Sequence, residues 1–222
     1  MLEARSITKR YGDLTVLSDI DMTVSKGEIV AVTGPSGAGK TTLLQILGTL
    51  DRPDSGKVLY DGKEVSGLGD KALSRFRNLN IGFVFQFHLL LPEFTVLENV
   101  AMPALIAGQR RRDAEASARR LIDYLGLSGR ASHRPSQLSG GERQRAAVAR
   151  ALVNEPSIVF ADEPTGSLDS ANRNDLQQLF FNLRRDFGHT FVIVTHDPSL
   201  AISADRTINL RDGRIVTDTP AQ

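Results

Sequence analysis

The residues Gly34-Pro35-Ser36-Gly37-Ala38-Gly39-Lys40-Thr41 fit the pattern G-x-x-x-x-G-K-[ST], and Thr42 follows them directly. The apolar run at residues 28–33 predicts a buried strand before this loop, and residues 40–47 predict a helix after it. Glycines allow the dihedral angles that bring loop N–H groups close to phosphate oxygens, and the helix start adds positive charge. Residues 34–42 are therefore predicted to bind a nucleotide, with Lys40 on its β- and γ-phosphates and Thr41 on Mg²⁺. The alternative is a glycine-rich turn that matches by chance.

Two carboxylates follow a second apolar run, at residues 158–161. Asp162 ends this predicted strand, which is the usual position of a carboxylate that holds Mg²⁺ through water. Glu163 can direct a second carboxylate at the attacking water, so we assign it the role of general base. Alone, two acidic residues here would more simply cap a strand or begin a turn. The phosphate-binding loop in the same chain favours the catalytic interpretation.

Gln86 and His196 each follow a short apolar run, at residues 81–85 and 191–195. Ligand-facing residues in open α/β sheets gather at such carboxyl ends of strands. Taken singly, each is more often a satisfied polar residue at a strand end. In combination with the other motifs, both are predicted to belong to the site.

The stretch Leu138-Ser139-Gly140-Gly141-Glu142 predicts a second anion-binding end. Ser139 and Glu142 have the S-x-x-E spacing of a capping box, in front of a helix that runs through Arg150. Ser139, Gly140 and Gly141 would expose a hydroxyl and backbone N–H groups at the positive end of that helix. The simpler interpretation is a helix start and nothing more.

The composition limits the class of protein. The 222 residues suffice for one sizeable core, or for a main domain with a subdomain. The 27 basic and 26 acidic residues give no broad positive field, so we expect no nucleic acid partner. The chain has no cysteine, which excludes disulfides and suits a reducing compartment. We see neither a signal peptide nor an apolar run long enough to span a membrane, and expect a cytoplasmic chain that reaches a membrane only through other subunits.

Strands alternate with helices along most of the chain. Strands are predicted at residues 14–24, 157–161, 190–195 and 206–210, a hairpin around Asp61-Gly62, and a helix at residues 170–187. The apolar spacing at residues 114–125 predicts a further helix, with Gly126 as its C-cap. This order predicts an α/β fold with a mainly parallel sheet covered on both faces.

The phosphate-binding loop, the stretch at residues 138–142 and the Asp162-Glu163 pair, in this order, resemble the ATP-binding cassette (ABC) ATPases over almost the whole chain. The resemblance implies a single domain with a P-loop NTPase (RecA-like) core, residues 1–94 and 152–222, that includes an N-terminal antiparallel β subdomain. It implies an inserted helical subdomain at about residues 95–151. It also implies ATP hydrolysis coupled to transport, with ATP and Mg²⁺ as cofactors and Thr41, Gln86 and Asp162 as the metal-binding residues.

The same resemblance implies roles for single residues. Gln86 would touch Mg²⁺ and the attacking water, His196 would contact the γ-phosphate, and Glu163 would be the base. Tyr11 would stack on adenine, although an ordinary strand aromatic is the competing interpretation.

The family pattern further implies a head-to-tail dimer. Ser139, Gly140 and Gly141 of one copy would complete the ATP site formed by the phosphate-binding loop of a second copy. Ser167-Leu168-Asp169 matches the D-loop at the dimer seam, with Ser167 where close relatives usually have Asn.

Residues 85–103 and 130–139 resemble the ATP-binding subunits of bacterial lipoprotein-releasing exporters, although Leu89 replaces a second His that is common after His88. This implies a peripheral protein on the cytoplasmic side of the inner membrane, bound to two permease subunits through the apolar segment after Gln86; a buried loop is the simpler interpretation of that segment. The ATPases of macrolide or peptide exporters and of a cell-division complex remain alternatives. An ABC protein acting on DNA or ribosomes fits less well, since the chain has one cassette and no sustained heptads.

Overall fold

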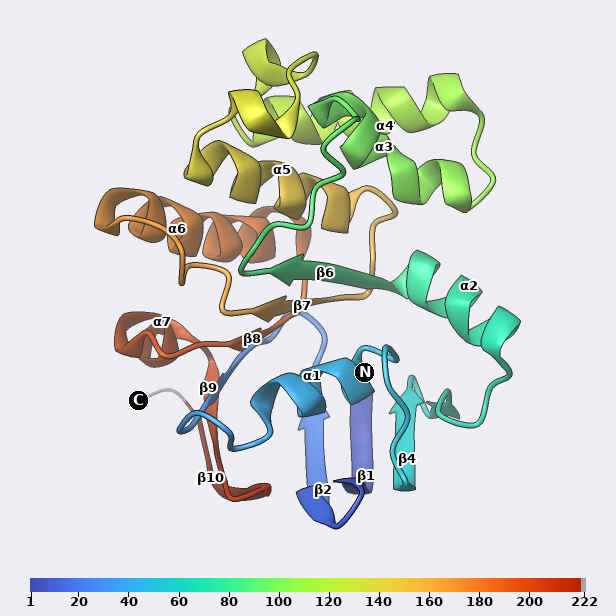
Figure 1. Cartoon of the computed structure of the whole chain (residues 1–222), viewed down its shortest axis with the longest axis vertical. Helices are drawn as coiled ribbons and strands as arrows, with labels where there is room; N and C mark the ends of the chain where they lie inside the picture. Colours follow the sequence, from blue (N-terminus) through green and yellow to red (C-terminus); the bar gives the residue numbers. More distant parts are fainter. Residues whose placement is uncertain (221–222) are drawn as a thin grey trace. The chain divides into compact units, whose positions relative to one another are not determined.

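The computed structural model describes residues 1–220, which divide into two compact units. Of the described residues, the first unit contains 1–74 and 184–220, and the second contains 75–183. Figure 1 shows the course of the chain and labels the helices and most of the strands. No helix among residues 1–220 is long and apolar enough to cross a membrane.

An antiparallel sheet lies in the first unit, with the strand order β2-β1-β4-β5. Its strands are β1 (Leu2–Tyr11), β2 (Leu14–Val24), β4 (Ser55–Tyr60) and β5 (Lys63–Glu64). Apolar side chains such as Leu2, Ala4 and Ile7 on β1 are buried, because one face of this sheet covers the core. The strand at residues 14–24 and the hairpin around Asp61-Gly62 are confirmed.

Parallel strands form the centre of the first unit. β3 (Ile29–Thr33) lies between β8 (Phe191–Val194) and β9 (Arg206–Arg211), and β10 (Arg214–Pro220) pairs antiparallel with β9. Every residue of β8 is buried, as expected of a parallel strand covered on both faces. Helix α1 (Lys40–Leu47) contacts β8, and helix α7 (Pro198–Ser203) contacts β3.

The second unit joins a parallel strand pair to a group of helices. β6 (Ile81–Phe85) pairs with β7 (Ile158–Asp162). Helices α3 (Val96–Ile106), α4 (Arg111–Tyr124) and α5 (Gly140–Leu152) pack on one another, as Figure 1 shows, and α5 also contacts β6. Short 3₁₀ turns at Ser128–Arg130 and Pro135–Gln137 lead into α5. The helices expected at about residues 95–151 therefore exist, while the exact limits of a subdomain remain a prediction.

Two helices connect the units along the chain: α2 (Asp70–Asn80) and α6 (Ser170–Phe187). The bounds of α6 agree with the sequence prediction. Helix α2 was not predicted from the sequence, and Leu73 is its only buried residue. Helix α4 begins at Arg111, before the first apolar position that the sequence pattern used, and Gly126 follows it with a φ of 69°. The α/β class with parallel strands is confirmed.

Candidate functional site

The phosphate loop, residues 34–42, follows β3, includes the first turn of α1 and depends on its glycines. Gly34 has a φ of 142°, and a Cβ atom there would lie 2.0 Å from the Leu210 carbonyl oxygen. Gly39 has a φ of 98°, and its Cβ would lie 2.8 Å from the carbonyl oxygen of Val16. No L side chain fits either position. Gly37 also has a positive φ but faces open space, so the loop leaves room for a ligand beside its backbone.

Lys40 lies folded back over this loop. Its buried side chain donates hydrogen bonds of 2.9 Å from Nζ to the carbonyl oxygens of Gly34 and Pro35. No side chain caps helix α1, whose N-cap is Gly39, and its first turn carries no acidic residue. The first-turn N–H groups and the Lys40 ammonium thus present positive charge at one place, as phosphate binding requires.

His196 lies at the same edge of the parallel strands as the phosphate loop. Val32 on β3 and Val194 on β8 are register partners, and the N–H of Thr195 donates to the Val32 carbonyl at 3.1 Å. His196 follows directly and is exposed. The first unit therefore brings the exposed His196 ring to the edge where the phosphate loop begins.

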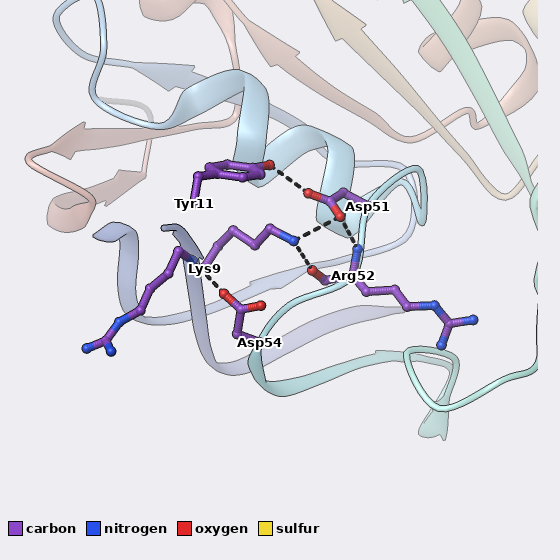
Figure 2. A network of polar contacts seen from close by, with 6 residues as sticks. Lys9, Tyr11, Asp51, Arg52 and Asp54 are labelled. Atoms are coloured by element: carbon purple, nitrogen blue, oxygen red, sulfur yellow. Dashed lines mark hydrogen bonds and ion pairs between the residues drawn. The ribbon is translucent and has the colours of Figure 1, made fainter. Parts of the chain in front are cut away.

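Tyr11 lies at the end of β1 and is half exposed. Its phenol donates a 2.7 Å hydrogen bond to Oδ2 of Asp51, and the Nζ of Lys9 lies 5.1 Å from its ring centroid (Figure 2). The hydrogen bond to Asp51 is the main reason why the pKa of Tyr11 is raised, and a side-chain hydrogen bond with Thr42 opposes this rise. Tyr11 is thus a partly exposed aromatic ring whose phenol is held by Asp51.

Gln86 and the two carboxylates gather at one edge of the second unit. Phe85 and Asp162 are register partners at the ends of β6 and β7, so Gln86 and Glu163 follow neighbouring strands. A Cβ atom on Gly166 would lie 2.9 Å from Nε2 of Gln86, which places the amide side chain against the turn after Glu163. Glu163 has a φ of 47°, a conformation that is uncommon outside glycine and concentrates at functional sites.

Ser167, the residue that departs from the family pattern, is placed by the same turn. Its Oγ donates a 3.1 Å hydrogen bond to the Gln86 carbonyl oxygen. The N–H of Gly166 donates to the carbonyl oxygen of Glu163 at 3.0 Å. The serine therefore fixes the backbone of Gln86 rather than pointing away from it.

The signature segment, residues 138–142, forms the predicted capping box. The N–H of Glu142 donates to Oγ of Ser139 at 3.2 Å, and the N–H of Ser139 donates to Glu142 Oε2 at 2.7 Å. Arg130 contacts the same carboxylate at 2.7 Å, and this hydrogen bond is the main cause that lowers the pKa of Glu142 to about 2. A serine hydroxyl can donate while it accepts, so this geometry leaves Oγ able to bind an anion.

Asp169 lies beside the signature segment. Its carboxylate accepts hydrogen bonds from the N–H of Asn172 at 2.9 Å and from Nδ2 of Asn172 at 2.7 Å. Gly141 lies directly against the Asn172 amide, and Gly140 contacts the Leu168 side chain. The second unit therefore holds two groups of predicted site residues, one around Gln86 and one around Ser139, with residues 166–169 belonging to both.

Sequence reasoning missed a set of contacts that holds the segment after Gln86. The guanidinium of Arg150 donates to the carbonyl oxygens of Leu89 at 2.5 Å and His88 at 2.8 Å. His88 and Leu89 have φ values of 62° and 49°. Nε2 of His88 lies 3.2 Å from the Gly140 carbonyl oxygen, and Nε2 of Gln144 donates to the Phe85 carbonyl at 3.2 Å. Helix α5 is thereby bound to both sides of Gln86.

Each unit contributes residues whose chemistry fits a magnesium nucleotide. The candidate metal ligands Thr41, Gln86 and Asp162 supply a hydroxyl, an amide and a carboxylate oxygen, which are the donors that Mg²⁺ prefers. The space at Gly37 and the basic loop fit phosphates, and the exposed ring of Tyr11 fits a flat base. Thr41 belongs to the first unit, whereas Gln86 and Asp162 belong to the second.

Comparisons with known proteins point to one family. The family model described as ABC transporter matches residues 17–166. The lipoprotein-releasing system ATP-binding protein LolD of Bacteroides fragilis is 59% identical over 216 residues, covering 97% of this chain and 100% of that protein. LolD of Geobacter metallireducens is 53% identical over 222 residues, covering 98% of this chain and 99% of that protein. A solved dimeric ATP-binding cassette in a post-hydrolysis state, bound to ADP and Pi, has a TM-score of 0.91 at 37% identity and covers 100% of this chain and 99% of that one.

Proposed function

This chain belongs to the ABC transporter family, and we propose that it is the ATP-hydrolysing subunit of an exporter that releases lipoproteins from a membrane. The observation that carries the proposal is the 53–59% identity to lipoprotein-releasing ATP-binding proteins along essentially their whole length. As an ABC cassette the chain binds and hydrolyses ATP. The substrate of the exporter would be bound by partner subunits, so this chain supplies the energy for release.

In the proposed site, residues 34–42 hold the phosphates of ATP and Tyr11 stacks on the adenine. The Nζ of Lys40 exchanges its two carbonyl partners for β- and γ-phosphate oxygens, which are better acceptors because they are charged. His196 contacts the γ-phosphate from the end of β8. Support comes from the shared position of these residues in the first unit and from the sterically required glycines.

Glu163 is proposed as the general base that takes a proton from the attacking water, and Gln86 positions that water. Mg²⁺, when bound by Thr41, Asp162 and Gln86, neutralises charge that develops on the phosphates. The uncommon φ of Glu163 and the packing of Gln86 on Gly166 support these roles, because both restrict where the two side chains can point.

Two copies of the chain are proposed to close on ATP, with the signature segment of one copy facing the phosphate loop of the other. The N-terminus of α1, which no side chain caps, and the N-terminus of α5, which Ser139 caps, both carry the positive end of a helix dipole. One γ-phosphate could therefore bind α1 of one copy and α5 of the other. The related cassettes solved as dimers support association of this kind. Hydrolysis would release the phosphate that links the two copies.

The permease subunits are proposed to bind the apolar surface after Gln86. Phe87 is 74% exposed and Leu89 is 58% exposed, which is unusual for large apolar side chains. Arg150 and Gln144 bind this surface to helix α5, which begins in the signature segment. A movement of a bound permease subunit could therefore be transmitted through α5 to the signature segment. The chain would then lie on the cytoplasmic side of the inner membrane, held there by its partners.

A reconstituted exporter tests this function. The chain is purified together with candidate permease subunits, placed in lipid vesicles loaded with an acylated lipoprotein, and supplied with ATP and a soluble lipoprotein carrier. We expect lipoprotein release that requires ATP and disappears with Glu163→Gln. An ATPase that ignores lipoprotein but is stimulated by macrolides or peptides would contradict the proposal and support a related exporter instead.

A further inference from the structure

The turn after helix α1 carries a polar network of which the proposed site uses only Tyr11. Asp51 lies at its centre, and Figure 2 shows its carboxylate between the Tyr11 phenol and the Lys9 ammonium. Oδ2 accepts the 2.7 Å hydrogen bond from Tyr11, and Oδ1 accepts a 2.9 Å hydrogen bond from Lys9 Nζ. Lys9 also donates to the Arg52 carbonyl oxygen at 2.7 Å.

This network is partly buried, which strengthens its ion pair. The Lys9 side chain is 10% exposed and that of Asp51 is 30% exposed, so water screens their ion pair less than it screens a surface pair. Burial by itself would raise the pKa of Asp51, but the hydrogen bonds from Tyr11, Lys9 and the Arg52 N–H outweigh it and lower the pKa. Asp51 is therefore a carboxylate at neutral pH, able to hold both neighbours.

The backbone of Asp51 is bound to the helix that begins at the phosphate loop. The N–H groups of Leu50 and Asp51 donate to the carbonyl oxygen of Gln45 in α1, at 2.7 Å and 3.2 Å. Helix α1 begins at Lys40. A short, hydrogen-bonded path thus runs from the phosphate loop through α1 and Asp51 to the Tyr11 ring.

Lys9 prepares the Tyr11 ring for a base. Its ammonium lies over one face, 5.1 Å from the centroid, so a base must approach the other face. A cation over one face is attracted to the ring electrons, which holds the ring in place and leaves its other face for stacking. Tyr11 is half exposed, which leaves ring surface for that contact.

We propose that Asp51 is a positioning residue for the nucleotide base. It fixes the Tyr11 ring and holds Lys9 against one face of that ring. It also sets the distance between the Tyr11 ring and the phosphate loop. The inference rests on the proposed nucleotide site and adds to it a residue that touches no part of the nucleotide. Its effect should therefore appear only for ligands that carry a base.

Calorimetric titration with ATP and with inorganic tripolyphosphate separates base from phosphate binding. Tyr11→Ala should weaken ATP binding about tenfold, the scale of one base–aromatic stack, and leave tripolyphosphate binding unchanged. Asp51→Asn, which keeps the shape but removes the charge, should weaken ATP binding about three- to tenfold, again without an effect on tripolyphosphate. The control is Glu64→Gln, which removes an exposed carboxylate 2.9 Å from Lys57 in the same sheet and should change neither affinity.

A spectroscopic measurement distinguishes positioning from general damage. Because the hydrogen bond to Asp51 is the main cause of the raised pKa of Tyr11, Asp51→Asn should lower that pKa towards the ordinary range. The phenolate absorbance difference between each protein and its Tyr11→Phe counterpart isolates this titration. Combining Tyr11→Phe with Asp51→Asn should weaken ATP binding less than the two single effects multiplied, since both changes remove one contact.

The outcomes separate this inference from the proposed function. ATP binding unchanged by Asp51→Asn but weakened by Tyr11→Ala would overturn the role of Asp51 and leave the proposed function standing. If Asp51→Asn weakened the binding of ATP and of tripolyphosphate equally, the positioning role would also be overturned, because Asp51 would then act on the phosphate loop or on folding. No ATP binding by the unaltered chain would contradict the proposed function and this inference with it.

Discussion

A Cβ atom on Gly141 would lie 2.2 Å from Oδ1 of Asn172, closer than any side chain can come to that amide. Gly141 is the second glycine of the signature segment, and Asn172 holds the Asp169 carboxylate by two hydrogen bonds. The start of α5 and the start of α6 therefore share one contact. The two predicted parts of the dimer seam, the signature segment and the D-loop, are built as one surface.

Gly141→Ala should disturb that surface. The methyl group must displace Asn172, which would loosen Asp169 and cost about 1–3 kcal/mol of unfolding free energy, as overpacking does. We expect ATP turnover to fall at least tenfold while the ATP affinity of the lone protomer is unchanged. Urea unfolding, ATPase assays and calorimetry measure the three quantities. Gly129→Ala is the matched control, since a Cβ there meets nothing within 4 Å, and equal effects of both variants would contradict the account.

The capping box should give a pH-dependent contribution to stability. The pKa of Glu142 is lowered to about 2, first by its hydrogen bond with Arg130, whereas an unfolded glutamate has a pKa of about 4.3. A lowered pKa in the folded state means that the stabilisation is complete above the unfolded pKa and is lost as pH falls towards the folded one. The difference in unfolding free energy between the wild type and Glu142→Gln should therefore shrink between about pH 5 and pH 2. A difference that grows on acidification would contradict the assignment.

Arg150→Met should release the turn after Gln86. The guanidinium holds the carbonyl oxygens of His88 and Leu89, whose left-handed conformations need support. Loss of hydrogen bonds from a charged donor should lower the unfolding free energy by about 1.5–3 kcal/mol. We also expect weaker capture of the permease subunits from detergent-solubilised membranes, with ATP affinity unchanged. Arg119→Met, on the exposed side of α4, is the control and should affect neither stability nor capture.

The sequence predicted those parts of the site that depend on local chemistry. The phosphate loop needs glycines at fixed positions, and Ser139 and Glu142 form a capping box because residues three apart meet at a helix start. Within each unit, parallel strands end at a common edge, which is why Gln86 could be placed near Glu163 in one unit and His196 near the phosphate loop in the other.

Residues that act across long separations could not be predicted in this way. Asp51 meets Tyr11 from 40 residues away, and Arg150 meets Leu89 from 61 residues away. Neither residue stands in a local pattern that indicates its partner. β10 was missed for another reason: most of its side chains are exposed, so it shows no apolar alternation.

If ATP is held between two copies of this chain, the association state of Glu163→Gln should depend on nucleotide. This variant should bind ATP without hydrolysing it, so sedimentation velocity with saturating ATP should show a dimer, and a monomer without nucleotide. Adding Ser139→Arg should abolish the dimer while ATP binding to the monomer persists, because only the partner's side of the site is blocked. A Glu163→Gln protein that remains monomeric with ATP, or a dimer indifferent to Ser139→Arg, would contradict the account.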